Sequence, residues 1–217
     1  MSDKCSVVHK LVNGLKEHRF SFEESEIPLN GIYILFEKGE FGHGQKRIVR
    51  IGTHTGDDQL RSRINQHFLR ENKDRSIFRK NIGRAILNKR NDPFLGDWEI
   101  DLTTKKAREQ HASRIDNEYQ KQIEIEVSEY IKRNCSFCTF EVRDKKTRLD
   151  IELKLISTVS WCNQCRPTQH WLGKHSPKEK ISQSGLWLVN GLYKIPADAS
   201  EVAWLSKLIK GKQPLEG

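Results

Sequence analysis

The chain has 217 residues, 35% of them hydrophobic, which is enough to bury one substantial core, and we expect a single globular unit. Lysine and arginine number 38 against 29 aspartate and glutamate, and the resulting formal charge of +9 favours a polyanionic partner, although a merely basic soluble protein is the alternative. No stretch approaches the roughly 18 consecutive apolar residues of a membrane span, and the first residues lack the pattern of a secretory signal. We therefore expect a cytoplasmic protein without membrane contact, whose five cysteines are reduced, metal-bound or simply buried.

The first elements predicted are a helix and a hairpin. Residues 7–19 carry apolar side chains at helical spacing, so the chain should open with a helical extension. Two runs of β-forming residues follow, Ile32–Phe36 and a run that ends at Arg50-Ile51-Gly52, joined by the glycine-bearing segment EKGEFGHGQ. Together they predict an antiparallel hairpin.

Helices dominate the rest of the chain. Asp57 and Asp58 can cap a helix whose buried stripe is Leu60, Ile64 and Phe68. The later elements are predicted as a helix over residues 76–90, one or two helices over 107–133, a strand over 137–142, a helix over 149–160 and a short helix over 202–209.

Chemistry-bearing residues follow one another in a fixed order. Gly31-Ile32-Tyr33 opens the first strand, and Arg50-Ile51-Gly52 ends the second. In the next helix, LRSRINQHF, Arg63 and His67 are four residues apart, so they lie on one face at the margin of the apolar stripe. From that margin both can reach a shared cleft.

A carboxylate follows in the helix TRLDIELKLIS. Helical geometry places Glu152 beside Leu149, Leu153 and Ile156 on the predicted buried stripe. A buried carboxylate needs a cation or an arginine as partner. The alternative is a glutamate at the edge of the stripe that reaches water or pairs with Arg148.

In this order and spacing, the elements resemble the GIY-YIG nuclease family, most specifically over residues 30–70 and more loosely over 145–190. The resemblance implies an α+β fold with a small antiparallel or mixed β-sheet flanked by helices. The nuclease domain would span residues 30–190 with a helical insertion at about 70–133, between a helical N-terminal extension over 1–29 and a helical C-terminal tail over 191–217.

The resemblance also implies roles for individual residues. Tyr33 is the tyrosine of the first tripeptide, Arg63 and His67 are the helix residues, and Glu152 is the metal-binding carboxylate, whereas Arg50 replaces the tyrosine of the second tripeptide. The segment HWLGKHSPKEKISQSGLW resembles the C-terminal block of bacterial restriction-type members. An asparagine often follows SGLW there; here the nearest is Asn190, which we include as a further site residue.

These roles imply a mechanism for cutting a phosphodiester. One Mg²⁺ or Mn²⁺ ion would bind Glu152 and keep several waters. Tyr33 would act as general base on the attacking water, with Arg50, Arg63 and the metal stabilising its phenolate. Arg63 would also clamp the scissile phosphate through its planar fork. His67 would hydrogen-bond Tyr33 or the attacking water, or be a structural histidine.

Basic residues concentrate after residue 69. With only Glu71 and Asp74 to balance the basic residues of 70–90, we expect this region to contact DNA phosphates, with the basic side chains outside and an apolar side buried; the alternative is an ordinary solvated helix face. The residues assigned to DNA binding are Arg70, Lys73, Arg75, Arg79, Lys80 and Arg84.

Four of the five cysteines form two pairs. Cys135 and Cys138, with Cys162 and Cys165, have the paired spacing of a four-cysteine structural zinc site. The alternative for Cys138 is a small buried hydrophobe within the alternating strand SFCTFEV.

The leading functional hypothesis is a restriction-type endonuclease that cuts duplex DNA, most simply as a homodimer. The alternatives are a repair or mobile-element nuclease that nicks DNA, and a non-catalytic nucleic-acid-binding module on the same scaffold.

Overall fold

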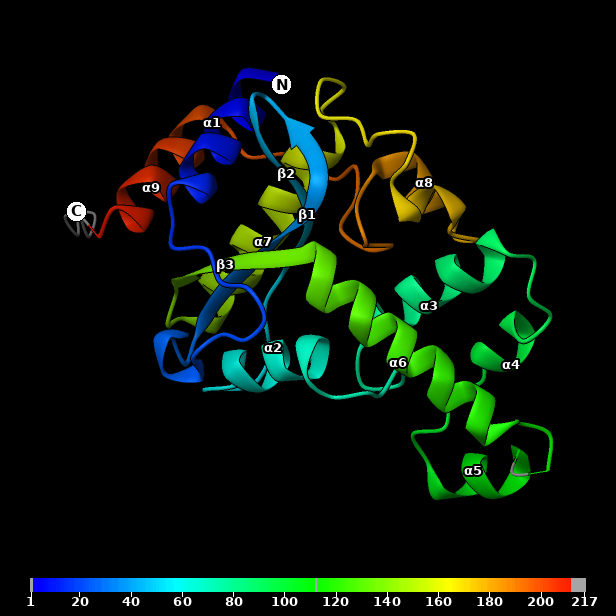
Figure 1. Ribbon diagram of the computed structural model, residues 1–217. Coiled ribbons are helices and arrows are strands. Elements are labelled where there is room, and N and C mark those ends of the chain that lie inside the picture. The colour runs from blue at the N-terminus through cyan, green and yellow to red at the C-terminus, as the bar shows by residue number, and fades with distance from the viewer. Residues whose placement is uncertain (1, 112, 212–217) are drawn as a thin grey trace.

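The computed structural model describes residues 2–111 and 113–211. Its centre is an antiparallel sheet in the order β2-β1-β3, formed by β1 (Gly31–Gly42), β2 (Gln45–Gly52) and β3 (Cys135–Glu141). Figure 1 shows helices on both sides of this sheet. The predicted α+β class, a small antiparallel sheet flanked by helices, is confirmed.

The helices surround the sheet in chain order (Figure 1). They are α1 (Ser2–Asn13), α2 (Leu60–Phe68), α3 (Ile77–Lys89), α4 (Leu95–Trp98), α5 (Lys105–His111), α6 (Asn117–Asn134), α7 (Lys145–Ser160), α8 (Glu179–Ser184) and α9 (Ala199–Ile209), with short 3-10 turns η1 (Glu24–Glu26) and η2 (Leu172–His175).

The alternation of side chains along β1 divides the core between the two faces of the sheet. Ile32, Ile34 and Phe36 point to one face and pack with buried residues of α1, α7 and α9. Tyr33 and Leu35 point to the other face and pack with buried residues of α2, α3 and α6. Successive residues of a strand point to opposite faces, so the sequence itself directs Tyr33 toward α2 and α3.

Two local predictions differ from the structure. The first helix covers Ser2–Asn13 rather than residues 7–19. Helix α2 is not capped by Asp57 or Asp58, because its N-cap is Gln59 and no side chain caps it. Asp58 instead accepts a hydrogen bond of 2.5 Å from Asn30 Nδ2, which ties the loop before α2 to the start of β1.

Candidate active site

The Tyr33 side chain crosses β2 directly over Gly52, where any larger residue would collide with it. Tyr33 pairs with Gly52 across the sheet, and a Cβ atom on Gly52 would lie 2.2 Å from the Tyr33 hydroxyl oxygen. The glycine of the second tripeptide is therefore a steric requirement of the tyrosine in the first.

Arg50 lies on the same face of the sheet as Tyr33, because it pairs with Leu35, two residues along β1 from Tyr33. The pairing shifts between Leu35↔Arg50 and Phe36↔Ile48, so Val49 is the extra residue of a β-bulge. Val49 packs in the same core as Tyr33, whereas Ile48 and Ile51 pack in the core on the opposite face. The bulge thus lies directly before Arg50, whose side is set by its pairing with Leu35, and Arg50 Nε donates to the Tyr33 hydroxyl at 3.2 Å.

His67 holds the same hydroxyl from the other side. Its Nε2 lies 2.8 Å from the Tyr33 hydroxyl oxygen, and its Nδ1 lies 2.7 Å from Ser76 Oγ, the cap of α3. Complete burial, followed by the charges of Arg50 and Arg63, holds the pKa of His67 well below its usual value. His67 is therefore a neutral hydrogen-bonding partner of Tyr33 at neutral pH.

Arg50 is fixed by three neutral groups. It donates to Tyr33 and to the Trp187 carbonyl, and its guanidinium carbon lies 5.5 Å from the centre of the Phe78 ring. Trp187, from the SGLW string, is anchored by its backbone N–H, which donates to the Val49 carbonyl at 2.7 Å. The C-terminal block of the sequence thus shapes the site by positioning Arg50.

Glu152 and Arg50 line one cavity of about 380 Å³, with Asn190 exposed at its margin and Trp187 in its wall. The backbone N–H of Thr53 donates to Glu152 Oε1 at 3.1 Å. Burial raises the pKa of Glu152, while Arg50 and the Thr53 N–H act against that rise. The carboxylate therefore faces a space in which a cation would stabilise its charged form.

The surroundings of Glu152 differ from the predicted stripe. Leu149 and Leu153 are exposed, because the buried face of α7 is formed by Ile151 and Leu155. Glu152 is half-buried at the margin of that face, beside the cavity. Arg148 donates to backbone carbonyls, among them that of Val142 at 3.3 Å, so it is held apart from Glu152 by other bonds.

Arg63 lines a neighbouring hollow of about 280 Å³, together with Thr53 and His54. Its guanidinium donates to Gln66 Oε1 at 3.0 Å and to the Arg75 carbonyl at 3.3 Å. Thr53 connects the two hollows. It lines the hollow of Arg63, and its backbone N–H donates to Glu152, which lines the cavity of Arg50. The structure therefore brings Arg50 and His67 into contact with the Tyr33 hydroxyl, and Thr53 lies beside both the hollow of Arg63 and the Glu152 carboxylate.

The family model of the GIY-YIG domain matches residues 5–214. The chain belongs to the GIY-YIG family. Comparison with curated proteins and with solved structures gave no match. The family identifies the domain as that of a nuclease, an endonuclease hydrolase whose substrate is DNA.

The side chains of the GIY-YIG domain that were assigned to DNA binding lie mostly inside it, and this corrects the predicted outward orientation. Lys73, Arg79, Lys80 and Arg84 are buried, whereas Arg70 and Arg75 are exposed. Each buried cation has a carboxylate partner: Asp74 pairs with Lys73 and Lys80, Glu124 with Arg79, and Glu99 with Arg84. These partners come from other segments as well as from the basic region itself.

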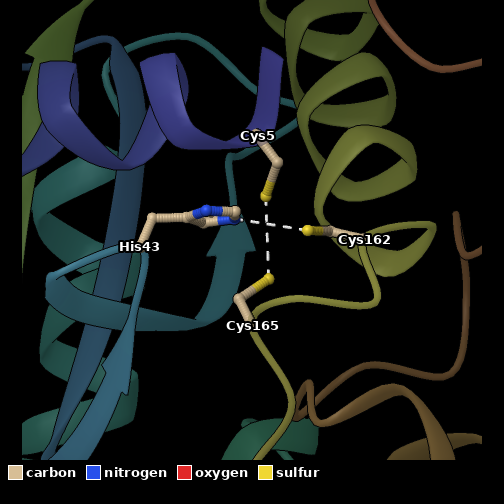
Figure 2. A group of neighbouring side chains, drawn as sticks. All are labelled: Cys5, His43, Cys162 and Cys165. Atoms are coloured by element: carbon tan, nitrogen blue, oxygen red, sulfur yellow. Dashed lines mark hydrogen bonds between the residues drawn. The ribbon is translucent and has the colours of Figure 1, made fainter. Parts of the chain in front are cut away.

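The predicted four-cysteine zinc site is wrong. Cys135 and Cys138 are three residues apart on β3, so their side chains point to opposite faces of the sheet, and they pack in different cores. Cys162 and Cys165 instead lie beside Cys5 and His43 (Figure 2). The sequence contained no spacing signal for Cys5 or His43, because they lie more than a hundred residues from the Cys162 pair.

Some residues of the site had no recognisable sequence signal. Ser76 orients His67, and Thr53 binds Glu152. Their contacts use backbone groups or a hydroxyl, which many residue types supply. Within residues 2–111 and 113–211, no helix has the length and apolar character needed to cross a membrane.

Proposed function

We propose that this GIY-YIG protein is a divalent-metal-dependent endonuclease that cuts duplex DNA, of the restriction type. The observation that carries the proposal is Arg50: a buried guanidinium that faces a cavity shared with Glu152 and is hydrogen-bonded to Tyr33. Among the residues that the structure describes, no carboxylate lies within ion-pair distance of Arg50. A buried guanidinium without such a partner is a favourable site for a phosphate.

Glu152 has the chemistry to hold the metal. It is a hard oxygen ligand with a raised pKa, it faces the cavity, and it accepts a hydrogen bond from the backbone N–H of Thr53. Mg²⁺ or Mn²⁺ bound there would neutralise charge that develops on the phosphate. Asn190, at the cavity margin, offers an amide to the same space.

Tyr33 is the proposed general base. Arg50 Nε–H donates to its oxygen, while neutral His67 holds the hydroxyl in place. Tyr33 is 1% exposed. The proposal therefore requires the Arg50 side chain to shift toward a bound phosphate, so that water reaches the hydroxyl.

The DNA backbone is proposed to lie across the exposed side of this site. Arg63 lines the hollow next to Thr53, and its bond to the Arg75 carbonyl places the exposed Arg75 beside it. Arg70, also exposed, follows α2. Phosphate contacts by Arg63, Arg70 and Arg75 would make binding weaken steeply with salt.

Two conservative variants test the mechanism. Tyr33→Phe keeps the buried ring and removes the hydroxyl, and Glu152→Gln keeps the shape and removes the charge. Each should reduce cleavage of plasmid DNA with Mg²⁺ by at least about 100-fold, the typical contribution of a positioned acid or base, while DNA binding stays near the wild-type level. Wild-type cleavage by Tyr33→Phe would mean that Tyr33 only positions Arg50.

The substrate distinguishes the candidate functions. Discrete fragments from plasmid and phage DNA support a restriction enzyme, and a homodimer in sedimentation experiments would explain cleavage of both strands. Nicking confined to branched DNA would instead assign a repair or mobile-element enzyme. Binding without any cleavage in Mg²⁺ or Mn²⁺ would assign a non-catalytic module.

A further inference from the structure

Four potential metal ligands meet far from the proposed active site. They come from three segments: Cys5 in α1, His43 in the turn between β1 and β2, and Cys162 and Cys165 in the loop after α7 (Figure 2). Their ligand atoms all lie within 4.8 Å of one another. The three cysteines are buried, and His43 is half-buried.

The spacing of the atoms is that of a tetrahedral metal site. Cys5 Sγ lies 3.6 Å from Cys165 Sγ, and His43 Nε2 lies 3.2 Å from Cys162 Sγ. In a tetrahedron of thiolates with bonds of about 2.3 Å to zinc, the sulfurs are about 3.8 Å apart. A disulfide requires about 2.05 Å between sulfurs, so the 3.6 Å separation is that of two ligands rather than a covalent bond.

The backbone around His43 supports a ligand role for its side chain. His43 and Gly44 form the two-residue turn of the hairpin, with φ of 54° and 71°. Positive φ at both positions is typical of two-residue hairpin turns, and histidine is one of the residues other than glycine that adopt it most readily. The turn places His43 at the tip of the hairpin, and its Nε2 faces the cysteine sulfurs.

A second histidine nearby is committed to the backbone. His9 Nδ1 lies 2.9 Å from the Cys5 carbonyl, which accepts only, so that nitrogen carries the proton. The backbone N–H of Ile48 donates to His9 Nε2 at 3.3 Å. Both ring nitrogens are therefore used, and the set of ligands is three cysteines and His43.

We propose that Cys5, His43, Cys162 and Cys165 bind one structural Zn²⁺. Four protein ligands of sulfur and imidazole leave no open position for a substrate or water, which is the arrangement of structural rather than catalytic zinc. His43 is also ten residues along the hairpin from Tyr33, which at about 3.3 Å per residue is roughly 30 Å. The ion fastens the N-terminal helix and the loop after α7 to the tip of the hairpin.

The first test is metal content and coordination in the whole protein. Purified wild-type protein should contain about one equivalent of zinc per chain, and X-ray absorption at the zinc edge should show three sulfurs near 2.3 Å and one nitrogen near 2.0 Å. This measurement needs no variant. Less than a tenth of an equivalent after reconstitution with zinc, a shell of four sulfurs, or a disulfide among these cysteines would overturn the proposal.

The second test uses matched variants. Cys162→Ser and His43→Ala should lower the zinc content at least about tenfold after dialysis against a weak chelator, because each removes one ligand of four. Cys138→Ser is the control, since Cys138 is buried in β3 and donates to the Val12 carbonyl, and it should keep its zinc. Full zinc in Cys162→Ser, or loss of zinc from Cys138→Ser at unchanged thermal stability, contradicts the assignment.

Discussion

Arg79 was predicted to bind DNA but has the contacts of a structural arginine, and its replacement by methionine distinguishes these two roles. The side chain is 0% exposed and donates to the Glu124 carboxylate at 2.9 Å, to the Glu124 carbonyl at 3.0 Å and to Ser128 Oγ at 2.7 Å. Methionine preserves much of the volume but leaves Glu124 buried without its partner. We expect Arg79→Met to destabilise the protein while leaving the DNA-facing surface intact.

The magnitude follows from the loss of one partner of a buried ion pair, which costs about 3 to 5 kcal/mol. At about 2.1 cal/mol/K per residue, the 217 residues give an unfolding entropy of about 0.46 kcal/mol/K, so Tm should fall by roughly 7 to 11 °C. Burial already raises the pKa of Glu124, and removal of Arg79 raises it further. The ionised form is then penalised above the unfolded-state pKa, so the loss of stability should be larger at pH 7.5 than at pH 4.5.

The assay is urea unfolding followed by circular dichroism, with DNA binding measured on the folded variant. Arg75→Met is the matched control. Arg75 is exposed, so the free energy of unfolding should change by less than about 0.5 kcal/mol. The slope of the logarithm of DNA affinity against the logarithm of salt concentration should decrease by about 1, the value for one phosphate contact. Arg79→Met with Glu124→Leu should recover part of the loss, because both charges are removed. Stability of Arg79→Met within about 1 kcal/mol of wild type, with DNA binding abolished, would refute the reasoning.

Two further predictions concern the site itself. Gly52→Ala places a methyl group where the Tyr33 hydroxyl lies, so cleavage should fall by roughly 100-fold through misplacement of the hydroxyl, as measured by plasmid cutting; an unchanged rate would show that the Tyr33 ring has free space. The pKa of His67 is lower in the folded protein than in the unfolded chain, so as pH falls the unfolded chain binds a proton at this residue first. The folded state therefore loses stability as pH falls below about 6.5. Urea unfolding of His67→Gln should therefore show less loss between pH 6.5 and 5.5 than wild type, by up to about 1.4 kcal/mol; equal slopes would mean that His67 is accessible to protons in the fold.

The parts of the site that the sequence predicted depend on local spacing. Arg63 and His67 share a helix face because they are four residues apart, and the strand positions of Tyr33 and Gly52 follow from short β-forming runs. Alternation along β1 also determines which core receives Tyr33. Such features involve neighbours within a few residues, so a single sequence contains the information needed to place them.

The contacts that the sequence did not predict join distant segments. Arg79 was expected on the outer face of its helix, yet its partner Glu124 lies 45 residues later, in α6. The bulge at Val49 was also unforeseen, because the extra residue becomes visible only when β2 is paired with β1. Likewise, Cys138 could be excluded as a zinc ligand only once β3 had been placed in the sheet.

The net charge of the chain is therefore a poor guide to its DNA-binding surface, because several of its arginines are buried and paired with carboxylates. Arg47, Arg79 and Arg84 are each buried against a carboxylate, so their charge is compensated inside the fold and offers little to a phosphate. Arg50 is also buried, but it contacts a hydroxyl, a carbonyl and an aromatic ring, none of which neutralises its charge. A guanidinium cannot discharge by losing a proton, so its charge stays available to the cavity. What distinguishes Arg50 from these three arginines is thus the identity of its partners. Arg148 is also buried and donates to carbonyls, but Arg50 in addition lines the cavity that contains Glu152, where a phosphate would supply its anion.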